Sequence, residues 1–221
     1  TVGPDFPPVD FYMFVRADSG VKTVQDLAGK SFGCGPPATT ATQICRSVLR
    51  AAGILDKVKL VELPFAQLAS QMVNGDIVGF SRVMVGQPAG FALRLSKRVD
   101  LRVLDLGALI DKSDLLKRSQ SLSATEIPKG TYKFQPGALR TVAFYSFFVV
   151  NKNVPADHVY ELARLMHSQA MVDHMKTAFR FHGFYPKNKT PLTGLVVPLH
   201  PGAEKFWKEV GVTIPKAKVA K

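Results

Sequence analysis

Segments with the residue pattern of β-strands alternate with segments patterned like α-helices along much of this chain. Strands are predicted at 11–16, 30–34, 58–62, 77–80 and 101–104. Helices are predicted between them, at 39–52, 65–73 and 88–96. Strands that alternate with helices indicate βαβ units and a largely parallel sheet. The sequence therefore predicts an α/β fold.

The end of the chain has a different pattern from this block. Residues 107–118 are patterned like a helix, a long strand is predicted at 141–150, and helices are predicted at 159–167, 170–179 and 200–210. The two strong strands, 11–16 and 141–150, flank the βα units as the hinge strands of a two-lobed clamp would. We therefore expect a first lobe from residues 1–18 and 141–221, and a second lobe from residues 19–140.

The composition is that of a folded chain with its own core. Of the 221 residues, 46% are hydrophobic, which is enough for a sizeable core without disulfide or metal staples. No apolar run reaches the ~18 residues of a membrane span, and the longest, 142–150, is interrupted by Ser146 and suits a buried strand. No signal peptide is present at the start, and a mature exported protein would also lack one.

The formal net charge is +12. This charge fits either a solvated basic surface or attraction for anionic partners. The basic residues are dispersed, and the sequence has no arginine-rich arm, zinc finger, homeodomain or RNP signature. Nucleic acid is therefore not an expected partner, and the charge supports an acidic small molecule only weakly.

Cys34 and Cys45 are the two cysteines, too few for a disulfide scaffold. Cys34 would end a strand and Cys45 would lie on the helix that follows. A bridge requires that helix to fold back over the end of the strand. Two buried free thiols are the favoured prediction, with a disulfide as the alternative, so the pair does not fix the compartment.

The turn between the predicted strand 30–34 and the helix 39–52 is the first candidate ligand site. Its proposed contacts are Ala38, Thr39, Thr40 and Thr42. Free N–H groups and the positive end of a helix dipole favour an anion there, and three hydroxyls can add donors. Simple helix capping by Thr39 or Thr40 is the alternative explanation.

A second candidate follows the predicted strand 77–80. Ser81 and Arg82 would lie at its carboxyl end, where ligands bind in open α/β sheets. Arg82 suits a carboxylate held by two parallel hydrogen bonds, and a surface salt bridge is an equally good explanation. Gln87, at the start of the next helix, is a further candidate contact or a helix cap.

Tyr132 is the last candidate contact. It lies in a Gly-Thr-Tyr segment between the predicted helix 107–118 and the strand 141–150. Its ring can stack on a ligand or hydrogen-bond it, or it can fill the surface of a lobe.

Catalytic and metal-binding patterns are missing from the sequence. It has no G-x-S-x-G elbow, P-loop, H-E-x-x-H motif or G-x-G-x-x-G after a strand. His167 and His174 are seven residues apart on predicted helices and are not expected to hold a metal. We therefore expect no enzyme activity, no metal and no cofactor.

A set of short motifs resembles the TAXI-type solute receptors of TRAP transporters and follows that family's order over nearly the whole chain. The motifs are VRADSG at 15–20, DLAGK at 26–30, GPP at 35–37, AAGI at 51–54, NGDI at 74–77, GQP at 86–88, IP at 127–128, GTY at 130–132 and PLHPGAE at 198–204.

The resemblance implies a type II periplasmic-binding-protein fold and a periplasmic location with the signal peptide removed. It implies a protein without catalytic activity that captures a small, anionic ligand of the amino acid or dicarboxylate type. Its partners would be the membrane permease subunits of a TRAP transporter. The ligand contacts would lie at the turn before the helix at Thr39 and in the segment 80–88.

Three departures from the family pattern affect these expectations. Ala-Thr-Thr-Ala at 38–41 replaces the usual Gly-Ser-Gly-Thr, so two glycines that allow close backbone approach are gone. An acidic residue and a second aromatic that are usual around Val78 and Ser81 are missing, and Arg82 changes the chemistry there. The family also begins with further βα units, so we expect the first lobe to be incomplete.

The main alternative is the effector-binding domain of a LysR-like transcription regulator, which uses the same fold at similar length. That reading requires a winged-helix segment and a linker helix upstream of the chain.

Overall fold

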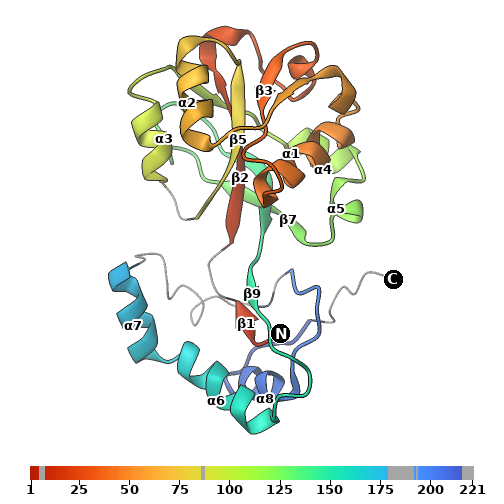
Figure 1. Ribbon diagram of the computed structural model, residues 1–221, viewed down its shortest axis with the longest axis vertical. Helices are drawn as coiled ribbons and strands as arrows, with labels where there is room; N and C mark the ends of the chain where they lie inside the picture. Colours follow the sequence, from red (N-terminus) through yellow and green to blue (C-terminus); the bar gives the residue numbers. More distant parts are fainter. Residues whose placement is uncertain (5–7, 86–87, 179–191, 193, 216–221) are drawn as a thin grey trace. The chain divides into compact units, whose positions relative to one another are not determined.

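The chain folds into two compact units in the computed structural model, which describes residues 1–4, 8–85, 88–178, 192 and 194–215. Unit 1 comprises Thr1–Val9, Gln120–Ser123 and Phe144–Lys221, and unit 2 comprises Asp10–Ser119 and Ala124–Ala143 (Figure 1). The expected first lobe included residues 10–18, whereas the structure places them in unit 2. The reason is that the strand they form pairs with other strands of that unit.

A mixed sheet forms the centre of unit 2. In the described part of the chain its order is β4-β3-β5-β2-β8-β7, and β6 pairs with β2. β3 is parallel to β4 and β5, and β6 is antiparallel to β2. The strands are β2 (Val9–Arg16), β3 (Ser31–Gly33), β4 (Lys59–Val61), β5 (Gly79–Val85), β6 (Leu101–Val103), β7 (Leu122–Ile127) and β8 (Leu139–Phe144).

Helices cover both faces of this sheet. They are α1 (Thr40–Ala51), α2 (Phe65–Asn74), α3 (Gly90–Leu95), α4 (Gly107–Lys112) and α5 (Leu115–Arg118). The chain passes from β3 through α1 to β4, then returns through α2 to β5 on the other side of β3. Right-handed crossovers in opposite directions place their helices on opposite faces. Accordingly, α1 and α2 both pack on β5 and lie on opposite sides of it (Figure 1).

The sequence of α1 explains both its ends and its buried face. Thr39 has extended backbone angles, and its hydroxyl caps the helix by accepting the Thr42 N–H. Ile44, Val48 and Leu49 are buried at helical spacing against the sheet. The chain leaves the helix at Gly53, whose φ of 69° suits glycine.

The core of unit 2 is rich in aromatic rings. Tyr12 and Phe14 of β2 stack with their centroids 5.4 Å apart, and Phe14 lies 6.4 Å from Phe80 of β5. Leu68 and Met72 of α2 are fully buried in the same cluster. This cluster supports the face of β5 that α2 and α3 cover.

Unit 1 has a small two-stranded sheet and a helical core. β1 (Gly3–Pro4) pairs antiparallel with β9 (Phe147–Phe148), and α6 (Ala156–Met166) packs on α8 (Pro201–Glu209). α7 (Gln169–Ala178) follows α6. Trp207 is buried there and donates its indole N–H to the Val2 carbonyl at 2.8 Å.

The predicted α/β class is confirmed, but two predicted elements are wrong. The expected single strand 141–150 is two strands, because β8 ends at Phe144 and β9 pairs in the other sheet. The expected helix 107–118 is α4 and α5, separated at Ser113, whose extended φ and ψ of −119° and 173° break the helix. Strands β1 and β7 were not predicted. Within the described residues, no helix has the length and apolar character that crossing a membrane requires.

Candidate functional site

The carboxyl ends of β3 and β5 meet where the direction of the chain connections reverses. From β3 the chain runs through α1 towards β4, whereas from β5 it runs through α3 to β6, which lies beside β2. Open α/β sheets bind ligands at such a switch point, outside the carboxyl ends of the strands. The turn 34–39 and the C-terminal half of β5 therefore border the place where a ligand is expected.

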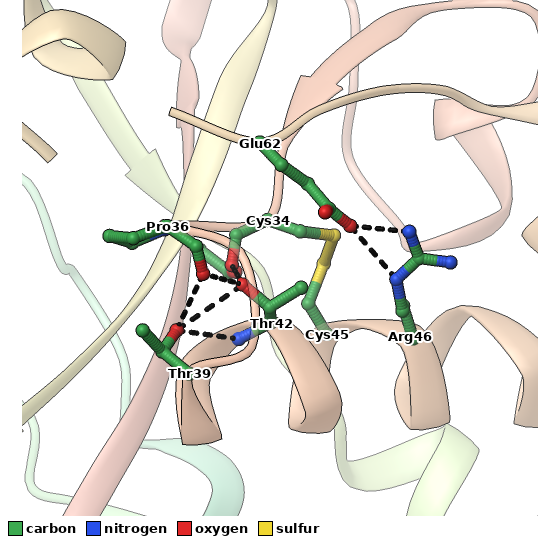
Figure 2. The surroundings of a disulfide bond; sticks show 8 residues. Cys34, Pro36, Thr39, Thr42, Cys45, Arg46 and Glu62 are labelled. Carbon is green, nitrogen blue, oxygen red and sulfur yellow. Dashed lines mark hydrogen bonds and ion pairs between the residues drawn. A yellow bond between two sulfur atoms is a disulfide. The ribbon is translucent and has the colours of Figure 1, made fainter. Parts of the chain in front are cut away.

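Two threonine hydroxyls close the turn between β3 and α1. Thr39 Oγ1 donates to the Pro36 carbonyl at 2.9 Å and accepts the Thr42 N–H at 3.4 Å. Thr42 Oγ1 donates to the same carbonyl at 2.6 Å and is buried (Figure 2). Both side chains point into the turn, so the structure uses them for helix capping and turn closure.

The first turn of α1 nevertheless offers donors. No hydrogen bond within the described residues engages the backbone N–H groups of Thr40 and Ala41. The Thr40 side chain is exposed. The positive end of the helix dipole adds to these groups. Of the predicted contacts in this turn, Thr40 is thus the one whose hydroxyl and N–H are both available.

Ala38 and Gly35 give the turn its shape. Ala38 is exposed and has a φ of 59°, a left-handed conformation that is strained for a residue with a Cβ. Gly35 has a φ of 106°, and a Cβ there would lie 3.2 Å from the Phe65 ring. Glycine at 35 therefore allows Phe65 to lie directly against the turn.

A disulfide joins Cys34 to Cys45, so the favoured prediction of two free thiols is wrong. The two Cα atoms are 5.5 Å apart. The physical reason is that the turn reverses the chain, so that α1 folds back over the end of β3 and its second turn faces Cys34 (Figure 2). Beside it, Arg46 of α1 forms an ion pair with Glu62, which follows β4.

Ser81 and Arg82 lie inside β5, because this strand extends to Val85 and not only to residue 80 as predicted. Successive side chains on a strand point to opposite faces. Ser81 is fully buried and donates to the Cys34 carbonyl at 3.1 Å, on the side of the turn. Arg82 points to the face that α2 and α3 cover.

The Arg82 guanidinium lies between two phenyl rings. Its central carbon is 4.4 Å from the ring centroid of Phe65 and 4.1 Å from that of Phe91. Among the described residues no carboxylate forms an ion pair with Arg82, and its buried Nε has no hydrogen-bond partner. Burial and the nearby Arg94 guanidinium both lower the pKa of Arg82. A bound anion would offset both effects, because an opposite charge favours the charged form of Arg82.

Phe65 connects the two parts of the site. One part of its ring lies against Gly35 in the turn, and its face stacks on Arg82. The structure therefore brings the turn 35–40 and Arg82 to the same end of the sheet. Phe65 and Phe91 were not among the predicted contacts. Both lie at the starts of the helices that follow β4 and β5, where aromatic side chains can reach a switch-point site.

Tyr132 lies in the core and not on the surface of the unit. It is 1% exposed, and its hydroxyl oxygen accepts the Ala89 N–H at 3.0 Å. Gln87, the remaining predicted contact, lies outside the described residues. Over the described ranges, no group of three or more His, Cys, Asp or Glu side chains is arranged to hold a metal ion.

Together, the sheet and this site define an α/β protein with anion-favouring groups at a topological switch point. Residues 7–211 match the model of the NMT1-like family, and the chain belongs to that family.

Solved structures of binding proteins resemble parts of the chain. A putative periplasmic sulfonate-binding protein, SsuA from Methylobacillus flagellatus KT, is 14% identical with a TM-score of 0.47, covering 95% of this chain and 61% of that one. An ancestral arginine-binding protein bound to arginine is 14% identical with a TM-score of 0.42, covering 80% and 62%. A truncated, arginine-bound ArgBP from T. maritima is 22% identical with a TM-score of 0.32, covering 45% and 42%.

The chain thus spans less than two thirds of the length of these binding proteins. A TAXI-type receptor of TRAP transporters is a more specific class of protein, and neither the family match nor these neighbours shows it.

Proposed function

We propose that this chain is a solute-binding protein that captures a small organic anion at Arg82, in the periplasm, for a membrane permease of the TRAP type. The observation that carries the proposal is the Arg82 guanidinium, stacked between two phenyl rings and without an acidic partner in the described structure. A partly buried cation without a counterion is unfavourable unless a ligand supplies one.

The geometry of Arg82 defines the head group of the ligand. Because the rings of Phe65 and Phe91 lie over the guanidinium, we expect a ligand to approach Arg82 at the edge of the guanidinium plane, where the N–H groups point. A carboxylate or sulfonate presents two oxygens to such an edge and forms parallel hydrogen bonds. The N–H groups of Thr40 and Ala41, at the start of the helix that follows the turn at Gly35, are the groups we propose for a second polar part of the ligand.

Further observations bear on the proposed compartment and on the proposed class of ligand. The Cys34–Cys45 disulfide is of the kind that persists in oxidising compartments. The solved neighbours include proteins that bind arginine or a sulfonate. The positive charge of the chain favours the acid over the cationic amino acid.

A thermal-shift screen tests the proposal with succinate, L-glutamate, ethanesulfonate and L-arginine. We expect at least one acid to raise the melting temperature of the wild type and of Arg98→Ala, a control that removes an exposed positive charge. Arg82→Ala should weaken binding about 10- to 100-fold, as expected for the loss of charge-assisted hydrogen bonds. Arg82→Lys should not restore it, because an ammonium lacks the planar fork. Stabilisation of Arg82→Ala equal to that of the wild type would refute the assignment.

A further inference from the structure

A single hydrogen bond attaches the start of α3 to a distant part of unit 2. The Ala89 N–H, directly before α3, donates to Tyr132 Oη at 3.0 Å, across 43 residues of sequence. Within the next turn α3 carries Phe91, which stacks on Arg82, and Arg94, which lowers the pKa of Arg82. The hydroxyl of Tyr132 is therefore connected to the candidate anion site through the first turn of α3, and not by direct contact with Arg82.

We infer that Tyr132 is a positioning residue of this site: its hydroxyl fixes the first turn of α3 and so holds the Phe91 ring against the Arg82 guanidinium. The inference rests on the proposed function for its biological meaning, but the geometry it describes can be tested without any ligand. It differs from the expectation that Tyr132 contacts the ligand, because the side chain is buried in the core.

Tyr132 is itself held firmly enough to act as an anchor. Its ring stacks on Phe134 with centroids 5.0 Å apart and meets the Tyr12 ring edge to face at 6.2 Å. The loop that carries it is closed by Gln135, whose buried side-chain amide donates to the carbonyls of Ile127, Pro128 and Gly137. The acceptor for the Ala89 N–H therefore has a defined position.

The helix, in contrast, has few other restraints. α3 is six residues long, its N-terminus has no side-chain cap, and Ala92 and Leu95 are its buried residues. Isolated helices of this length are unstable, so their orientation depends on tertiary contacts. The Phe91 ring also meets Phe80 of β5 edge to face, with centroids 5.9 Å apart. Loss of the Ala89–Tyr132 hydrogen bond would leave Phe91 held by this contact and by the packing of the second turn.

Tyr12 provides a matched control in the same cluster. Its ring is equally buried and its hydroxyl lies near that of Tyr132, but within the described structure the Tyr12 hydroxyl makes no hydrogen bond to α3. Tyr132→Phe and Tyr12→Phe therefore remove the same atom from neighbouring rings, and only the first removes the bond to α3. Ala89→Pro deletes the same bond from the donor side, and the φ of −78° at Ala89 is compatible with proline.

The experiment measures two ligand-free properties of the full chain: hydrogen exchange of the α3 amides, and the rate at which phenylglyoxal modifies Arg82, located by mass spectrometry. We expect Tyr132→Phe and Ala89→Pro to accelerate both about fivefold, as for the loss of one neutral hydrogen bond, and Tyr12→Phe to leave both at the wild-type rate. Exchange of the α1 amides serves as the internal reference and should not change.

Equal acceleration in Tyr12→Phe and Tyr132→Phe, or acceleration spread over α1 as well as α3, would show a general effect of core packing and overturn the inference. Wild-type rates in Tyr132→Phe would overturn it too. Neither result bears on whether acids bind at Arg82, because the acid screen with Arg82→Ala decides that separately.

Discussion

Ala38 is a residue whose backbone conformation conflicts with its side chain. Its φ of 59° is left-handed, and its side chain is exposed, so no packing is lost when the Cβ is removed. We predict that Ala38→Gly raises the free energy of unfolding by about 0.5–1 kcal/mol, because glycine adopts this conformation without steric cost. Urea denaturation followed by circular dichroism measures the change.

The matched control is Ala51→Gly, at a position with ordinary helical backbone at the end of α1. There the same substitution should lower stability by about 0.5–1 kcal/mol, since glycine disfavours helix. Two changes of the same sign would mean that residue 38 does not have a left-handed backbone in solution.

At the residue scale, the sequence predicted where the candidate site would lie but not which of its hydroxyls would be used inside the turn. The turn at 38–42 and Arg82 were predicted because strand, turn and helix signals placed them at the ends of strands. Which hydroxyls are free could not be predicted. Thr39, Thr42 and Ser81 all donate to backbone carbonyls of the turn, and those partners exist only once β3, α1 and β5 are packed together.

The disulfide connects two elements, β3 and α1, directly beneath the candidate site. It closes a loop with a sequence separation of 11 residues. Cross-linking a loop of that size stabilises the folded state by about 2–3 kcal/mol, mainly by restricting the unfolded chain. We predict that Cys34→Ala/Cys45→Ala lowers the urea midpoint accordingly.

Dithiothreitol provides the control for the disulfide variant. It should lower the midpoint of the wild type to that of the double variant and leave the double variant unchanged. A wild-type midpoint that does not respond to the reductant at any concentration, together with two titratable thiols, would indicate that the cysteines are free.

The ends of strands were harder to predict than their positions in the chain. The candidate site includes the part of β5 that was not predicted to be a strand. β5 continues through Ser81 and Arg82 to Val85, although residues 81–82 do not have the apolar pattern of a buried strand. They remain extended because Ser81 bonds to the Cys34 carbonyl on one face and Arg82 stacks between aromatic rings on the other. These partners lie outside the strand itself, directly after β3 and on the helices α2 and α3, so the local pattern could not show them.

At the scale of the whole molecule, the alternation of strand and helix was readable because each element has its own hydrophobic period. The boundary between the two units was harder to predict from the sequence. Residues 141–150 form one apolar stretch in sequence, yet β8 pairs in the large sheet of unit 2 and β9 pairs with β1. Pairing partners decide such a break, and two of them, β1 and β2, lie more than a hundred residues away in sequence.

The pH dependence of stability should have two limits, which come from different groups. Three carboxyl groups have lowered pKa values because they accept hydrogen bonds. The pKa of Asp18 is lowered by Arg16, that of Asp26 by the N–H groups of Lys22 and Thr23, and that of Asp111 by Arg140. A carboxyl whose folded pKa is lowered stabilises the protein above its unfolded pKa of about 4. That contribution disappears as the pH falls through the folded pKa, so stability should decline below about pH 4.

At the alkaline limit the sign is reversed. Burial is the main cause that raises the pKa of Tyr12 and of Tyr132, and the nearby Tyr132 hydroxyl and Asp10 carboxylate raise that of Tyr12 further. A tyrosine that ionises only after unfolding stabilises the folded state fully below its unfolded pKa of about 10, and that stability is lost as pH rises towards the folded pKa. Above pH 10 each such tyrosine should contribute a loss of about 1.4 kcal/mol per pH unit.

Tyr12→Phe should therefore reduce the slope of the unfolding free energy against pH above pH 10 by the contribution of one tyrosine. Tyrosinate absorbance monitors the ionisation. The decline of stability below about pH 4 should be unchanged. If Tyr12→Phe leaves the alkaline slope unchanged, Tyr12 ionises in the folded protein and is not buried as the structure has it.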